Sequence, residues 1–202
     1  MDWGDSCVGW ADIAERPPGV VCPPRIEYPA PPSPVRLLFV SWNPPGSQHF
    51  WNSEADRLRT HLSWVLGELG WMTRPDFLGE FLRRGTFLVH AVKCWQQRDW
   101  PSSDAMTRCA PASFLTDLLR LQPERLCLLG RVPFEVASKV VHGLPAVVPS
   151  YFEGWAGEVN IPSETGPRRL STLVTVLPTH FNRKHTLATL KNWLPPSSKA
   201  LT

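Results

Sequence analysis

Four short apolar runs constrain the fold of this chain more than any other feature. They are VRLLFV at 35–40, TFLVHAVKC at 86–94, RLCLLG at 125–130 and TLVTVLP at 172–178. Runs of this length, bounded by Gly, Pro and polar residues, indicate strands that are buried on both faces. We therefore expect these four segments to form the central sheet of the molecule.

Helical periodicity lies between the first two runs. A capping box at Ser53 and Asp56 begins the pattern, Gly70 ends it, and the apolar positions are Leu58, Leu62, Val65, Leu66 and Leu69. Further helices are expected near 75–84, 112–122, 133–142 and 184–194. Alternating strands and helices predict an α/β fold, a three-layer α/β/α sandwich around a mainly parallel four-stranded sheet. In such sheets the chemistry lies beyond the carboxyl ends of the strands.

The length and composition favour one domain. With 202 residues, 43% of them apolar, the chain can bury one core but is short for two. Eight prolines between 17 and 34 predict an irregular N-terminal arm over 1–34, leading into an α/β domain over 35–202. No apolar run approaches the roughly 20 residues that span a bilayer. We expect a cytoplasmic monomer that does not contact membranes.

The positive charge is concentrated near the end of the chain. Residues 165–202 contain no acid and carry Arg168, Arg169, Arg183, Lys184, Lys191 and Lys199. Because the net charge of the whole chain is +3, this segment at +6 leaves −3 for the remainder. A basic segment of this kind suits a nucleic-acid backbone, although such runs also form ordinary solvated faces.

Four segments, taken in order, resemble the uracil-DNA glycosylase superfamily. LLFVSWNPPGS is similar to its first motif, an apolar strand that leads into a Gly-x-Asn-Pro-Gly turn, and FLVHAVKCW is similar to the second segment of its iron-sulfur branches. QPERLCLLG resembles the linking strand, and VTVLPTHFNRKH resembles the last motif, usually His-Pro-Ser followed by a DNA-inserting loop. Together they cover roughly 35–195 and are more specific than any one alone.

The resemblance implies a role for Asn43 and for two aromatic residues. Asn43 matches the Asn that, in the mismatch-specific and single-strand-selective branches, holds the attacking water. Orienting this water toward the sugar carbon is worth several kcal/mol, although an Asn here can also simply cap a tight turn. Phe50 lies where the family stacks an aromatic on the flipped base, with Trp51 as the alternative. Either ring could equally be core packing.

Two positions depart from the family pattern. His90 lies four residues before Cys94, where the family has the Asn that reads the uracil edge, and Leu177 lies where the last motif begins with His. His90 is therefore expected to read the base edge, unless it is a core histidine. His180 is the candidate that stabilises the departing base, a role that main-chain N–H groups can share; contact with phosphate or solvent is the alternative.

The basic final loop is the predicted DNA contact. Phe181 is the candidate wedge that fills the space left by a flipped base. Arg183 and Lys184 are expected to hold phosphates, and Asn182, which precedes them, is also expected to contact DNA. The expected partner is DNA, which implies a nucleoid-associated protein.

Cysteine spacing adds a metal hypothesis. The resemblance to the iron-sulfur branches implies a cluster held by Cys7, Cys22, Cys94 and Cys109, although the 15-residue spacing of Cys7 and Cys22 departs from the usual close pair. Four converging thiolates suit a structural 4Fe-4S cluster, or alternatively zinc, and four ordinary cysteines are the competing interpretation. Cys127 is expected to be a buried small apolar residue.

The sequence hypothesis is a monofunctional DNA glycosylase that hydrolytically excises a modified or damaged base, in repair or in defence against phage DNA. Because an imidazole cannot copy the paired donor and acceptor of an amide, we expect a base other than plain uracil. Two alternatives stay open. One is a superfamily member that binds a DNA lesion without turnover, and the other is a metal-bearing α/β enzyme acting on nucleotides.

Overall fold

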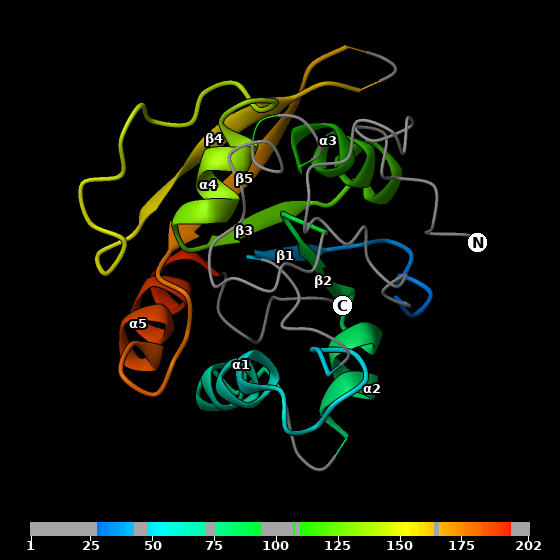
Figure 1. The fold of residues 1–202 in the computed structure, drawn as a ribbon, viewed down its shortest axis with the longest axis vertical. Helices are drawn as coiled ribbons and strands as arrows, with labels where there is room; N and C mark the ends of the chain where they lie inside the picture. Colours follow the sequence, from blue (N-terminus) through cyan, green and yellow to red (C-terminus); the bar gives the residue numbers. More distant parts are fainter. Residues whose placement is uncertain are drawn as a thin grey trace, which may run out of the picture.

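The computed structural model describes residues 28–42, 48–71, 76–93, 107, 110–163 and 166–194. Strands and helices alternate along the chain for most of its length (Figure 1). In chain order they are β1 (Leu37–Ser41), α1 (Arg57–Glu68), α2 (Phe77–Arg83), β2 (Thr86–His90), α3 (Ala110–Leu121), β3 (Arg125–Leu129), α4 (Arg131–Ala137), β4 (Trp155–Ile161), β5 (Arg168–Thr175) and α5 (Arg183–Trp193).

The central sheet has the order β2-β1-β3-β5-β4 in the described part of the chain. Strands β2, β1, β3 and β5, which correspond to the four apolar runs, are parallel neighbours. Their carboxyl ends therefore meet at one edge of the sheet, as the sequence predicted. The α/β fold with a mainly parallel sheet is thus confirmed.

The expectation of a four-stranded sheet is wrong, because β4 adds a fifth strand antiparallel to β5. This edge strand reads WAGEVNI, and its exposed residues alternate with more buried ones. Polar side chains at every second position are normal where one face of an edge strand meets solvent. This strand therefore has no continuous apolar run by which its sequence could have been recognised.

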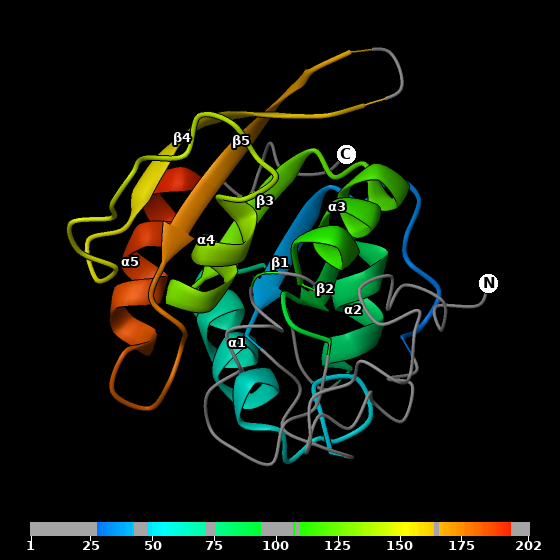
Figure 2. The same ribbon diagram turned by 45° about the horizontal axis from the view of Figure 1, so that its top comes forward.

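Helices lie on both faces of the sheet. Figures 1 and 2 show α3 and α4 on one side, and α1 and α5 on the other. Asp56 precedes helix α1, and its carboxylate accepts the backbone N–H of Arg59 at 2.8 Å, so Asp56 and not Ser53 caps the helix. Gly70 ends the segment with φ +69°, a left-handed conformation that glycine adopts without strain. No helix in the described ranges is long and apolar enough to cross a membrane.

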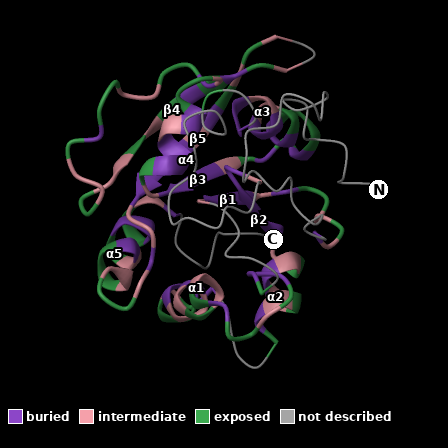
Figure 3. Ribbon diagram, viewed as in Figure 1, coloured by how far each residue is buried: buried purple, intermediate pink, exposed green. Residues whose placement is uncertain are grey.

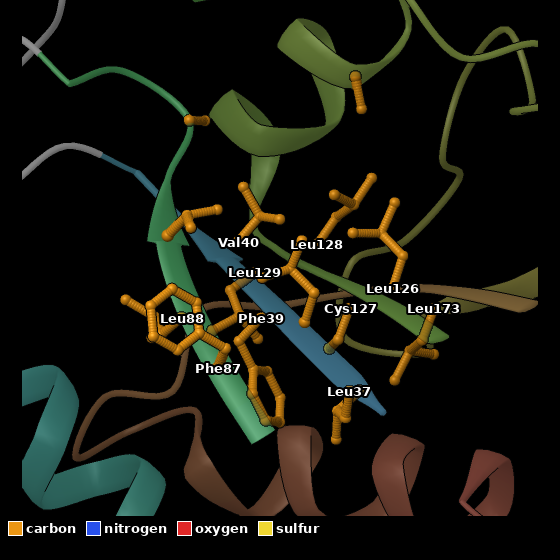
Figure 4. Close-up of a cluster of buried hydrophobic side chains, with 14 of the residues drawn as sticks. Leu37, Phe39, Val40, Phe87, Leu88, Leu126, Cys127, Leu128, Leu129 and Leu173 are labelled. Atoms are coloured by element: carbon orange, nitrogen blue, oxygen red, sulfur yellow. The ribbon is translucent and has the colours of Figure 1, made fainter. Parts of the chain in front are cut away.

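The core is built on the strands and on the inner faces of the helices (Figure 3). Alternate residues of β1 point to opposite faces, with Val40 toward α4 and Leu37 and Phe39 toward the α1 and α5 side (Figure 4). Phe39 stacks on Phe81 of α2 with ring centroids 6.1 Å apart. Cys127 of β3 is fully buried among these side chains, which confirms the prediction for this cysteine.

The described end of the proline-rich arm packs on the domain. Tyr28 is buried, and its ring lies 6.2 Å from the rings of Phe87 and His90, both on β2. The arm segment 28–34 therefore contributes a side chain to the region where β2 ends.

Candidate active site at the carboxyl edge of the sheet

A cavity of about 770 Å³ opens where the carboxyl ends of β1, β2 and β5 meet. Ser41 and His90, the last residues of β1 and β2, contribute to it, and the segment after β5 and the start of α1 form its walls. The other lining residues are Trp42, Gln48, Phe50, Ala55, Asp56, Arg57, Leu58, Thr60, His61, Leu177, Pro178, Thr179, His180 and Phe181. This is the edge at which open parallel sheets carry their chemistry.

A second cavity of about 830 Å³ lies between the arm and the end of α3. It is lined by residues 30–35, which precede β1, and by Arg120 and Gln122. It is therefore next to the amino end of β1, away from the strand ends that carry the candidate residues.

Four of the residues proposed from the sequence line the cavity at the carboxyl edge of the sheet together: Phe50, His90, His180 and Phe181. They come from three separate segments of the chain. Asn43 lies outside the described residues, between Trp42 and Gln48, which both line the cavity.

The two aromatic candidates for base stacking differ in their surroundings. Phe50 lines the cavity but is almost fully buried, edge-on to Trp51 and Phe77. Trp51 does not line it; its indole N–H donates to the Leu88 carbonyl at 3.2 Å and its ring packs on Phe87. The structure therefore favours Phe50 over Trp51 as a group that a ligand could reach.

His90 is held by Tyr28 of the arm. Its Nδ1 lies 2.9 Å from the Tyr28 hydroxyl, and its backbone N–H donates to the same oxygen at 3.3 Å. Within the described residues Nε2 has no hydrogen-bond partner, so it is the ring nitrogen that remains for a ligand. Burial, and then the nearby His49 and Lys93, lowers the pKa of His90 to about 3, so the imidazole is neutral at physiological pH.

This buried imidazole should make the fold acid-sensitive. Its folded pKa of about 3 is below the ordinary value, so between pH 6.5 and 3 the unfolded chain binds a proton that the folded chain does not, and stability falls as pH falls. Between pH 7 and pH 5, this proton binding lowers the free energy of unfolding by about 2 kcal/mol. In denaturant unfolding, the free energy of unfolding of the native protein should fall by about this amount more than that of His90→Asn when the pH is lowered from 7 to 5. Parallel pH profiles would contradict the assignment.

Ser41 is a cavity residue that the sequence analysis missed. It pairs in register with His90 across β1 and β2, so both side chains lie at the same level of the sheet. Its hydroxyl is buried and has no partner among the described residues. An unpaired buried hydroxyl is costly unless something bonds to it, so Ser41 is available to a polar ligand. Its position at the end of an apolar run, just before the turn predicted at Asn43, could have identified Ser41 as a cavity residue from the sequence.

The loop after β5 carries the remaining candidates. Phe181 is 87% exposed, and its ring meets that of His180 edge-on at 5.4 Å. Leu177, at the position where the family has His, lines the cavity with an apolar side chain. Asn182 is the N-cap residue of α5 without a side-chain capping bond. Lys184 is exposed and does not line the cavity.

The start of α1 supplies two further basic residues that the sequence analysis did not select. Arg57 and His61 are one helical turn apart and both line the cavity. Arg183 of α5 holds its guanidinium 4.3 Å from the ring centre of Trp64, also on α1. Their helical spacing on α1 was visible in the sequence, but which face would meet the cavity was not.

The metal hypothesis cannot be placed in the structure, because Cys7, Cys22, Cys94 and Cys109 lie outside the described residues. Within the part of the chain that the structure describes, no group of three or more His, Cys, Asp or Glu side chains could hold a metal ion.

Comparison with protein-family models and with curated proteins finds no match for this chain. Function must therefore be argued from the residues and their geometry.

Proposed function

We propose that this protein is a DNA glycosylase that flips a modified or damaged base into the cavity at the carboxyl edge of the sheet and hydrolyses its glycosidic bond. The observation that carries the proposal is that one cavity collects Phe50, His90, His180 and Phe181. These residues match the roles that the sequence resemblance implies, which are base stacking, base reading, charge stabilisation and wedging. Helices on both faces of a mainly parallel sheet are what a three-layer α/β/α glycosylase fold requires.

Each cavity residue has a chemical task in this proposal. The base enters beside Phe50, and the Nε2 of His90 and the hydroxyl of Ser41 meet its polar edge. Asn43 holds the attacking water, and His180 or main-chain N–H groups receive the negative charge that develops on the departing base. The exposed ring of Phe181 fills the gap in the base stack. The substrate would be DNA in the cytoplasm, bound by a monomer.

A second candidate is a member of the same superfamily that binds a lesion without turnover. Leu177 favours it, because an apolar side chain lines the cavity where the family places the His that stabilises the leaving base. Such a protein would bind modified DNA at the same cavity and release nothing.

A base-release screen tests the proposal and separates these candidates. Purified protein is incubated with single- and double-stranded oligonucleotides that each carry one modified base, and free base and abasic sites are measured over time. Repeated turnover on at least one substrate is expected. Tight, selective binding without release would favour the lesion-binding protein, and salt-insensitive binding would argue against DNA as the partner.

We also propose that the four cysteines bind a structural 4Fe-4S cluster, or alternatively zinc, that joins the arm to the domain. An ion pair supports a connection between two of the segments involved. The ammonium group of Lys93, the residue before Cys94, lies 2.6 Å from the carboxylate of Asp117 in α3, the helix that begins directly after Cys109. Bound metal would contribute folding free energy without redox turnover.

The cluster proposal predicts a brown protein that absorbs at about 400 nm, where thiolate-to-iron charge transfer lies. Cys94→Ala should lower the free energy of unfolding far more than Cys127→Ala. The first change removes a metal ligand, whereas the second leaves only a small cavity in the core. Metal analysis, absorbance and denaturant unfolding give the measurement. Metal-free protein with intact stability would end the proposal.

A further inference from the structure

Basic side chains face one another across the mouth of the cavity. Arg57, His61 and Trp64 lie at positions i, i+4 and i+7 of α1, which places them on one side of that helix. His180 lines the cavity from the loop after β5, and Arg183 reaches from the first turn of α5 to the ring of Trp64. Helices α1 and α5 run next to each other on the same side of the sheet (Figures 1 and 2).

These basic side chains have no ion-pair partner within the described part of the chain. Arg57, His61, His180 and Arg183 form no ion pair with an acid there, whereas Arg59 of the same helix pairs with Glu54 at 3.4 Å. Asp56 also lines the cavity, but its carboxylate accepts the Arg59 backbone N–H and caps α1.

His61 is partly buried and has basic neighbours. Burial, and then Arg183, His180 and Arg57, lowers its pKa below the ordinary value. Its Nδ1 is buried and has no hydrogen-bond partner among the described residues. An anion beside these groups would offset the repulsion and give this nitrogen a partner.

We propose that Arg57 and His61 of α1, together with Arg183 of α5, form an anion-binding site that holds a DNA phosphodiester next to the flipped nucleotide. The choice of DNA rests on the proposed function, while the anion site itself does not. A continuous strand fits better than a free anion, because the basic mouth opens into the base cavity and has the exposed ring of Phe181 beside it.

Arg59 provides a matched control for Arg57. Both are arginines in the first turn of α1, but Arg59 is paired with Glu54 and does not line the cavity. Arg57→Gln should weaken binding of a 12-nucleotide oligonucleotide about 5- to 10-fold at 0.1 M salt and reduce the salt slope by about one unit. Arg59→Gln should change neither value.

A second measurement follows the His61 imidazole by NMR over a pH titration. The probes are the oligonucleotide and sodium sulfate, an anion whose charge is constant over this range, each compared with sodium chloride at equal ionic strength. The oligonucleotide should raise the pKa of His61 in the native protein and not in Arg57→Gln.

Each outcome decides one part of the proposal. Equal effects of Arg57→Gln and Arg59→Gln, or a His61 pKa that neither probe moves, would overturn the site. A response to sulfate but not to the oligonucleotide would overturn the DNA assignment in favour of a free anion. If no base is released but the oligonucleotide response and the arginine contrast remain, this site stands and the glycosylase proposal fails.

Discussion

Asn43→Ala is expected to lower base release by about 10²- to 10⁴-fold while DNA binding changes little. A side chain that positions water acts mainly in the transition state, because the water is weakly held until the glycosidic bond begins to break. Asn43 lies outside the described residues, and the described residues on either side of segment 43–47 line the cavity, namely Ser41, which ends β1, Trp42 and Gln48. Single-turnover release and oligonucleotide binding should therefore be measured on the same variant.

Two further variants make this measurement specific. Asn43→Asp keeps an oxygen that can accept a hydrogen bond from water, so it should retain more activity than the alanine variant. Asn160→Ala removes an exposed amide from the edge strand β4, away from the cavity, and should leave turnover unchanged. Native turnover in Asn43→Ala would remove this residue from the mechanism and leave the cavity without an assigned water-binding group.

The strands that the sequence predicted are those for which burial leaves an unambiguous pattern. β1 and β3 are flanked by strands on both sides and packed between helices, so almost every residue must be apolar. β4 is the last strand of the described sheet, bridged on its outer side at Asn160, and has one partly solvated face. Glu158 and Asn160 interrupt its apolar pattern. Its signal is alternation over seven residues, which is weaker than a continuous run.

The sequence predicted site residues mainly in the segments that end or follow the strands. His90 ends β2 and His180 follows β5, so the rule for parallel sheets places both at the same edge. Tyr28 could not be assigned in this way, because its contact with His90 spans 62 residues and depends on how the arm folds back. Arg57 and His61 were missed for a related reason, since periodicity locates a helix but does not say which face meets a cavity.

Plain uracil is expected to be released about 10- to 100-fold less efficiently than the preferred base. The reason is the contact between Tyr28 and His90. An amide at position 90 would offer a donor and an acceptor to the uracil edge from one planar group. His90 is neutral, and its Nδ1 and backbone N–H both contact the Tyr28 hydroxyl, which leaves Nε2 as its group for the base. One nitrogen cannot satisfy both N3–H and O4 of uracil. A buried polar group left unpaired costs about 1 to 3 kcal/mol, which gives this range.

Comparing the native protein with His90→Asn on matched oligonucleotides checks this prediction. The asparagine variant should gain on uracil relative to modified bases, of which a modified cytosine, with its N3 acceptor, and a deaminated purine are the first to try. Tyr28→Phe removes the hydroxyl that occupies Nδ1 and should shift the same ratio while leaving the ring of His90 in place. His142→Asn, at an exposed position of a β-bridge outside the cavity, is the control for loss of an imidazole. Efficient uracil release by the native protein, unaffected by His90→Asn, would show that His90 does not read the base and that Ser41, beside it at the end of β1, is the next residue to test.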